Sequence, residues 1–277
     1  MMTAILGLWL ASAVAASPVE PDLAYGSHPR QRLDLVVPAT KGFPTVIFVH
    51  GGSLSTGDKG DEDYGKVCRA FPAAGIACAN VNYRLAADAG WPAPAEDVAS
   101  AVTWVRAHIA ERGGDPDRLF LFGHSSGALL AALVGAKVGT AAVRGVVPMG
   151  SIMWDDQVQE ALRTHTRQEV EGAFQRSPDN RMFASLDAYL DHWPMGHIGA
   201  GLPPFLLVHG TGDMSVLYNW SPQFQAKLKA AGVQCDLITI PDGVHGMARW
   251  ESSAPEYKDK VADWLAQKLS AKQESGK

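Results

Sequence analysis

The pentapeptide Gly123-His124-Ser125-Ser126-Gly127 carries the strongest structural signal in this chain of 277 residues. The preceding Arg118-Leu119-Phe120-Leu121-Phe122 is an apolar run that predicts a buried strand, and the small, helix-forming residues 128–134 follow it. We therefore expect Ser125 at a sharp strand-to-helix corner. Flanking glycines are typical of such a corner, because the neighbouring backbone leaves no room for a Cβ atom and the first turn of the helix directs unpaired N–H groups toward the serine.

The rest of the chain alternates between strand patterns and helix patterns. Apolar runs and alternating segments predict further strands at 32–37, 45–49, 75–81, 145–149, 204–208 and 235–240. Helical patterns, some with proline or glycine at their ends, predict helices at 64–71, 96–106, 221–231 and 256–268. This alternation is typical of an α/β fold, in which helices cover both faces of a mostly parallel sheet.

One long segment departs from the alternation. Residues 151–201 contain no strand pattern, several helix-like polar stretches and the aromatic side chains Trp154, Phe174, Phe183, Tyr189 and Trp193. We interpret the segment as a helical, cap-like insertion that lies over the site built around Ser125. The alternative is a set of peripheral helices packed on the edge of the sheet.

The composition is that of an ordinary soluble enzyme, with 47% hydrophobic residues, 19% charged residues and a net charge of −5. Because there is no basic excess, neither a nucleic acid nor an anionic membrane surface is expected as a partner. No segment contains eighteen uninterrupted apolar residues, so we predict no transmembrane anchor. A small neutral molecule fits this composition as the substrate.

The first residues resemble a secretory signal peptide, because an apolar stretch from Ala4 to Leu10 is followed by small residues up to Ala16. We therefore expect a signal peptide over 1–16, one mature domain over 17–277, and a secreted or periplasmic protein rather than a cytoplasmic one.

The three cysteines, Cys68, Cys78 and Cys235, lack the spacing of a metal site. They are either buried small hydrophobic residues or, if the protein is exported, include a Cys68–Cys78 disulfide.

A serine hydroxyl is a weak nucleophile, so a reactive Ser125 needs a base that accepts its proton. His245 is the candidate base, because it stands in a turn-rich loop directly after the last predicted strand. Asp213 is the candidate acid that orients this imidazole: it follows the strand at 204–208 and precedes His245 in the chain order Ser, Asp, His. Asp236 and Asp242 are the competing acids, but the first lies within a predicted strand and the second is close in sequence to His245.

Attack by a serine also needs N–H donors that stabilise the resulting oxyanion. The loop His50-Gly51-Gly52-Ser53 follows a buried strand and precedes Ser125 by about seventy residues. We expect the backbone amides of Gly51, Gly52, Ser53 and Ser126 to form the oxyanion hole. A plain tight turn is the alternative for the glycine loop.

Taken together, these segments resemble the α/β-hydrolase carboxylesterases with a His-Gly-Gly oxyanion motif, in the branch of hormone-sensitive-lipase-like and bacterial feruloyl- and xylan-acetyl-esterase-like enzymes. The likeness covers most of the mature chain. The segments that carry it are Arg30–Leu35, His50–Gly52, Asn82–Leu85, Pro94–Val98, Gly113–Arg118, Gly123–Gly127, His209–Asp213 and Val244–Gly246. The chain departs from the pattern at Ser53, where a third glycine is usual, and at Leu54, where a bulky aromatic residue is common.

The resemblance implies hydrolysis of carboxylic esters through an acyl-enzyme on Ser125, with His245 as base, Asp213 as its partner, and neither a metal nor another cofactor. Our leading hypothesis is an esterase that acts on small or short-acyl esters. An amide hydrolase with the same triad, such as a formamidase or a small peptidase, is the alternative activity. A ligand-binding protein that keeps the fold without catalysis is a third hypothesis.

Overall fold

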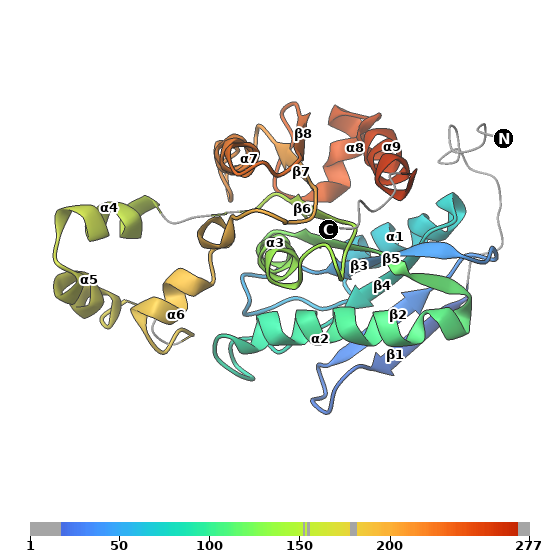
Figure 1. Cartoon of the computed structure of the whole chain (residues 1–277), viewed down its shortest axis with the longest axis horizontal. Helices are drawn as coiled ribbons and strands as arrows, with labels where there is room; N and C mark the ends of the chain where they lie inside the picture. Colours follow the sequence, from blue (N-terminus) through green and yellow to red (C-terminus); the bar gives the residue numbers. More distant parts are fainter. Residues whose placement is uncertain (1–17, 152, 154–155, 178–181, 271–277) are drawn as a thin grey trace.

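A computed structural model of the chain describes residues 18–151, 153, 156–177 and 182–270. Its centre is an eight-stranded sheet with the order β1-β2-β4-β3-β5-β6-β7-β8 (Figure 1). From β4 to β8 all neighbouring strands are parallel, whereas β2 pairs antiparallel with both β1 and β4. The predicted mostly parallel α/β fold is therefore confirmed. The strands are β1 (Val19–Ala24), β2 (Arg32–Val36), β3 (Phe43–Val49), β4 (Ala77–Val81), β5 (Gly114–His124), β6 (Gly145–Met149), β7 (Phe205–Gly210) and β8 (Cys235–Ile240).

Two strands differ from the sequence prediction. The first, β1, was not predicted, because Val19–Ala24 contains a proline and no apolar alternation, and it forms an exposed edge strand paired only with β2. The second, β5, begins at Gly114, four residues before the apolar run at 118–122. The sequence did not predict these first residues because they pair little and are only partly buried. Both differences lie in exposed or partly buried strand segments, where burial leaves no apolar pattern in the sequence.

Helices cover the sheet on both faces, and alternate strand residues divide the core in two. Leu119 and Leu121 of β5 point to the core shared with α2, α3 and α7, whereas Phe120 and Phe122 point to the core shared with α1, α8 and α9. The helices of the α/β body are α1 (Glu62–Ala70), α2 (Ala93–His108), α3 (Ser126–Val138), α7 (Trp220–Ala230), α8 (Trp250–Ser253) and α9 (Tyr257–Ser270). The candidate site residues lie in loops that this body holds in place.

Within the described residues, the regular structure of the insertion is helical, and turns and irregular segments connect the helices. It contains α4 (Asp156–Thr164), α5 (Arg167–Phe174), α6 (Leu186–Asp191) and the short turn Pro194–His197, which lie together to one side of the α/β body (Figure 1). Tyr189 forms ring contacts with Phe174, Phe183 and Trp193 at centroid distances of 5.2–5.9 Å. Phe183 in turn contacts Trp91, 5.6 Å away, in the loop before α2.

These contacts attach the insertion to the body of the protein beside α2, and an ion pair between Lys137 of α3 and Asp191 adds to them. Its position over the site around Ser125 stays a prediction. Trp154, which was assigned to the insertion, and the predicted signal peptide over 1–16 lie outside the described residues.

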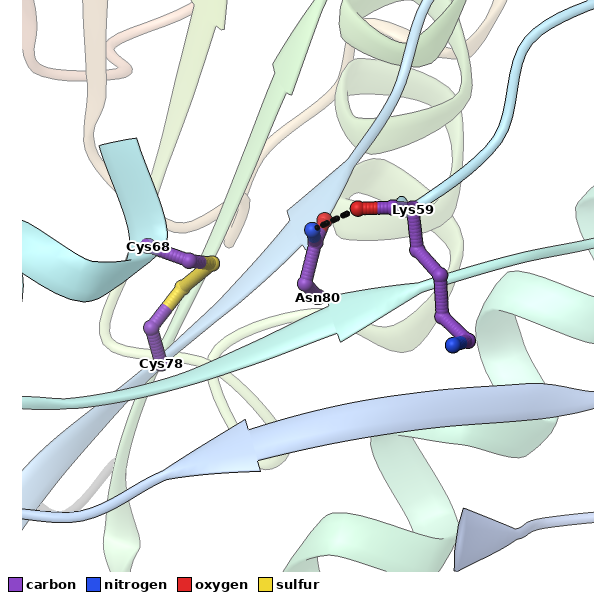
Figure 2. The surroundings of a disulfide bond; sticks show 4 residues. All are labelled: Lys59, Cys68, Cys78 and Asn80. Carbon is purple, nitrogen blue, oxygen red and sulfur yellow. Dashed lines mark hydrogen bonds between the residues drawn. A yellow bond between two sulfur atoms is a disulfide. The ribbon is translucent and has the colours of Figure 1, made fainter. Parts of the chain in front are cut away.

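A disulfide joins Cys68 of α1 to Cys78 of β4, with 5.3 Å between their Cα atoms (Figure 2). Of the two alternatives for the cysteines, this pair forms the bridge, while Cys235 is a free, buried thiol. The disulfide fixes α1 on the sheet, close to the loop that carries Lys59 (Figure 2).

Candidate active site

Ser125 lies at the predicted corner between β5 and α3. Its backbone has φ 55° and ψ −125°, a strained conformation for a residue with a side chain. The flanking glycines are needed for steric reasons: a Cβ on Gly123 would lie 2.2 Å from the carbonyl oxygen of Gly127, and a Cβ on Gly127 would lie 2.2 Å from the carbonyl oxygen of Val49. The corner therefore has room for the side chain of Ser125, whereas positions 123 and 127 accept only glycine.

His245 and Asp213 form the predicted pair. The Nδ1 atom of His245 lies 2.7 Å from Oδ2 of Asp213, and each residue follows the carboxyl end of a strand, β8 and β7 respectively. Since a carboxylate only accepts, Nδ1 of His245 carries the proton of this hydrogen bond, and Nε2 is left as the basic nitrogen.

The competing acids lie elsewhere. Asp236 accepts a hydrogen bond from the indole of Trp264, and Asp242 is exposed on its turn. Asp213, in contrast, has a fully buried side chain. Its Oδ1 accepts the amides of Ser215 and Val216 at 2.9 and 2.8 Å.

Burial favours the neutral form of the Asp213 carboxyl, but hydrogen bonds from Val216 and His245 outweigh this effect and hold its pKa below the ordinary value. The ionised form of Asp213, which this lowered pKa favours, is the form that can stabilise an imidazolium on His245.

The pair lies next to the corner that carries Ser125. The Ser125 amide donates to the carbonyl of Met149 at 2.9 Å, and the next residue, Gly150, lies beside the pair. A Cβ on Gly150 would lie 3.6 Å from Oδ2 of Asp213 and 3.7 Å from Nδ1 of His245. Among the described residues no hydrogen bond joins Ser125 Oγ to His245, and such contacts commonly shorten when substrate binds.

The four predicted oxyanion donors differ in their surroundings. The Gly51 amide donates to the hydroxyl of Tyr64 at 3.1 Å, so it is occupied. Within the described part of the chain, the amides of Gly52, Ser53 and Ser126 have no acceptor. The structure therefore narrows the candidates from four amides to three.

The backbone of the glycine loop explains its departure from the family pattern. A Cβ on Gly52 would lie 2.1 Å from the carbonyl oxygen of Thr56, so this position requires glycine. Ser53 and Leu54 have φ of 53° and 59°, within the small left-handed region that a residue with a Cβ can occupy. The serine therefore keeps the local path of the chain.

Two side chains near the corner were not assigned a role from the sequence. Ser126 Oγ accepts the Leu54 amide at 3.3 Å, which ties the glycine loop to the first turn of α3. Tyr64 lies on α1, and its position in the sequence of that helix does not distinguish it from an ordinary residue of an amphipathic helix. Only the fold brings it to the Gly51 amide and to His124.

Two cavities lie close to this region. An apolar one of about 330 Å³ separates α1 from α9 and is not lined by any of the candidate residues described above. A second, of about 440 Å³, is lined by Tyr64, His124 and Gly246 together with the acidic residues 61–63. We place the site by the geometry of Ser125, Asp213 and His245, since neither cavity contains these side chains.

Two further findings concern the described residues alone. They contain no cluster of three or more histidine, cysteine or acidic side chains suited to a metal ion. They also contain no helix with the length and apolar character needed to cross a membrane.

Comparison with solved structures supports the fold. A carbohydrate esterase from gut microbiota superposes with a TM-score of 0.75 over 94% of this chain and 99% of its own, at 19% identity. Esterase Est2 from Thermogutta terrifontis gives 0.72 over 95% and 96%, at 21% identity. The α/β-hydrolase fold implied by the resemblance is confirmed.

Comparison with curated proteins and family models gives the family. Esterase LipC from Mycobacterium tuberculosis is 28% identical over 80% of this chain and 58% of its own length. The chain spans about half the length of the first curated relatives it matches. The BD-FAE family model matches residues 33–228, which include the glycine loop, Ser125 and Asp213. The chain therefore belongs to the BD-FAE family of α/β-hydrolase proteins.

Proposed function

We propose that this protein is a serine carboxylic-ester hydrolase that acts on small or short-acyl esters. The observation that carries the proposal is the 2.7 Å hydrogen bond between buried Asp213 and His245, next to a serine held in a strained corner conformation. The named esterases among the relatives and structural neighbours support the same reaction class.

In the proposed reaction, Nε2 of His245 takes the proton of Ser125 Oγ as the oxygen attacks the ester carbonyl. Asp213 holds the imidazole in the required tautomer and stabilises the positive charge that forms on it. The imidazolium then protonates the leaving alcohol, and an acyl group remains on Ser125. Water, activated by the same imidazole, releases the acid and restores the serine.

The amides of Gly52, Ser53 and Ser126 are the proposed donors to the oxyanion. Their positions at the start of α3 and in the facing loop favour this role, because the first N–H groups of a helix have no partner within the helix. The loop that brings Ser53 close is held by the contact between Leu54 and Ser126 Oγ.

Ligands bound in two neighbouring structures support the short-acyl part of the proposal. Structures of Est2 from Thermogutta terrifontis, which share the fold, contain bound butyrate and bound propionate.

The test combines labelling with a substrate panel. A fluorophosphonate probe should label the wild type at Ser125, and Ser125→Ala should abolish both labelling and hydrolysis. Ser126→Ala should still be labelled and should keep about a tenth of the wild-type rate. Rates on p-nitrophenyl esters from acetate to palmitate should fall as the chain lengthens, and a matched anilide should react far more slowly. Absence of labelling in folded protein would overturn the reaction class, and a preference for palmitate would overturn the short-acyl assignment.

We further propose that the protein is exported with cleavage near Ala16. The Cys68–Cys78 disulfide supports this, because such bonds persist mainly in oxidising compartments. Intact-mass measurement of the protein from the medium or periplasm of an expressing cell should give a chain that starts at Ser17. A full-length chain found only in the cytoplasm would contradict it.

A further inference from the structure

We infer, on the basis of the proposed function, that Tyr64 and His124 are positioning residues whose hydrogen bonds hold the glycine loop and the loop of His245 together around Ser125. The contacts form one continuous relay, from the Gly51 amide through Tyr64 and His124 to the carbonyl of His245.

The relay has a single hydrogen-bond direction. The Nε2 atom of His124 lies 2.8 Å from the carbonyl oxygen of His245, and because a carbonyl only accepts, Nε2 carries a proton. In a neutral imidazole Nδ1 is then an acceptor, so the hydroxyl of Tyr64, 3.2 Å away, donates to it. The same hydroxyl accepts the Gly51 amide at 3.1 Å.

The surroundings of His124 favour that neutral form. Its side chain is buried, and burial together with the neighbouring His245 lowers the pKa of His124 to about 4. The other groups near it are Asp213 and His209, and Tyr64 faces it from α1. At neutral pH a single tautomer therefore persists, and the direction of the relay does not change.

Each end of the relay meets a different part of the proposed machinery. At one end, Gly51 precedes the proposed oxyanion donors Gly52 and Ser53. A Cβ on Gly51 would lie 3.0 Å from the Ser125 Cβ, which shows how closely this backbone approaches the serine. At the other end, the acceptor is the backbone of His245 itself, and the two imidazole rings lie 4.8 Å apart.

The helix that supplies Tyr64 is itself anchored. Cys68 follows Tyr64 by four residues, one turn along α1, and its disulfide to Cys78 holds that turn on β4 (Figure 2). The Tyr64 ring also contacts the Phe48 ring of β3 at 5.8 Å. The hydroxyl is thus presented by a fixed element, which suits a positioning role.

Three variants separate the links of the relay. Tyr64→Phe removes the hydroxyl and keeps the ring contacts. His124→Gln keeps an N–H near the position of Nε2 and loses the acceptor for Tyr64, whereas His124→Asn keeps an acceptor near Nδ1 and loses the donor to His245. Tyr25→Phe is the matched control, since it removes another buried tyrosine hydroxyl, which donates to the Asn82 carbonyl away from the site.

We expect each relay variant to lower kcat for p-nitrophenyl acetate about tenfold with KM within about twofold, because the loss misplaces reacting groups and leaves substrate binding unchanged. Tyr64→Phe combined with His124→Gln should lower kcat by less than the product of the single effects, since both break the same link. Tyr25→Phe should keep kcat. Active-site titration with the fluorophosphonate gives kcat per folded site.

A second measurement reads the relay without activity. In uniformly ¹⁵N-labelled protein, His124 should show the Nε2–H tautomer at neutral pH, and the Gly51 amide shift should move in Tyr64→Phe but not in Tyr25→Phe. The Nδ1–H tautomer or a cationic His124, or an unchanged kcat in Tyr64→Phe, would overturn the relay. A wild type that has the expected tautomer yet is not labelled at Ser125 would instead overturn the proposed function, and with it any catalytic role of the relay.

Discussion

Replacement of Gly127 by alanine tests how far the corner around Ser125 depends on a missing side chain. The new Cβ would lie 2.2 Å from the carbonyl oxygen of Val49 and 2.3 Å from that of His50. Contacts of this kind are essentially never below 3.0 Å, so the backbones must separate by at least 0.8 Å (3.0 − 2.2). Both atoms that must move are backbone atoms of β3 and the loop that follows it, which cannot yield as a flexible side chain can.

Two effects of opposite sign contribute to the stability of Gly127→Ala. Alanine is favoured over glycine in a helix by about 1 kcal/mol. Forced separation of packed backbone typically costs about 1–3 kcal/mol. The difference between the two effects predicts a net loss of up to about 2 kcal/mol in the free energy of unfolding, measured in urea. Catalysis should suffer more, because a displacement of this size at the reacting groups corresponds to about a hundredfold loss of kcat.

Gly199→Ala is the matched control, because nothing lies within 4 Å of its Cβ position and its φ is not in the left-handed region. Its free energy of unfolding should stay within about 0.5 kcal/mol of wild type, with unchanged kcat. The steric reasoning fails if Gly127→Ala matches the control in both measurements.

The other predictions concern the triad, the glycine loop, the disulfide and the response to acid. Asp213→Asn should lower kcat by about 10⁴ while circular dichroism stays unchanged, since the amide favours the wrong tautomer of His245. Ser126→Ala keeps its backbone amide and loses the acceptor for Leu54, so kcat should fall only about tenfold. Cys68→Ala with Cys78→Ala opens a loop of separation 10 and should cost about 2.7 kcal/mol in urea unfolding, with dithiothreitol giving a similar loss in the wild type. Because the pKa of His124 is lowered to about 4, the unfolded chain binds this proton more readily. The free energy of unfolding should therefore keep its full value above about pH 6.5 and fall by about 3 kcal/mol toward pH 4. Buried His50 and His209, whose pKa values are also lowered by burial, add to that fall, and His124→Gln should remove only the share of His124.

The sequence predicted best those features whose cause is local. Phe120 and Phe122 belong to a run buried on both faces of the sheet, and such runs show as uninterrupted apolar stretches. The glycines at 123 and 127 record a steric demand of the corner that a pattern of five residues displays. The edge strand β1 escaped prediction because its stability comes from pairing with β2, and its exposed side chains carry no matching signal.

The oxyanion amides show the limit of local evidence. Gly51 and Gly52 are adjacent in a glycine-rich loop and were predicted to act alike, yet the first amide is bound by Tyr64 and the second has no acceptor among the described residues. The difference arises from a side chain thirteen residues away on a helix. No pattern within the loop contains that information.

The same argument explains why the relay is a property of the fold. Its hydrogen bonds span sequence separations of 13, 60 and 121 residues, and none of its members is unusual in its own segment. His124 was visible only as the variable residue of the serine motif, whose position next to Ser125 requires nothing of its side chain. What makes it informative is that a neutral imidazole between a carbonyl and a tyrosine hydroxyl allows one proton arrangement only. A site that depends on this arrangement is sensitive to the identity of residue 124 through its two hydrogen bonds. The contrast between His124→Gln and His124→Asn separates these two links.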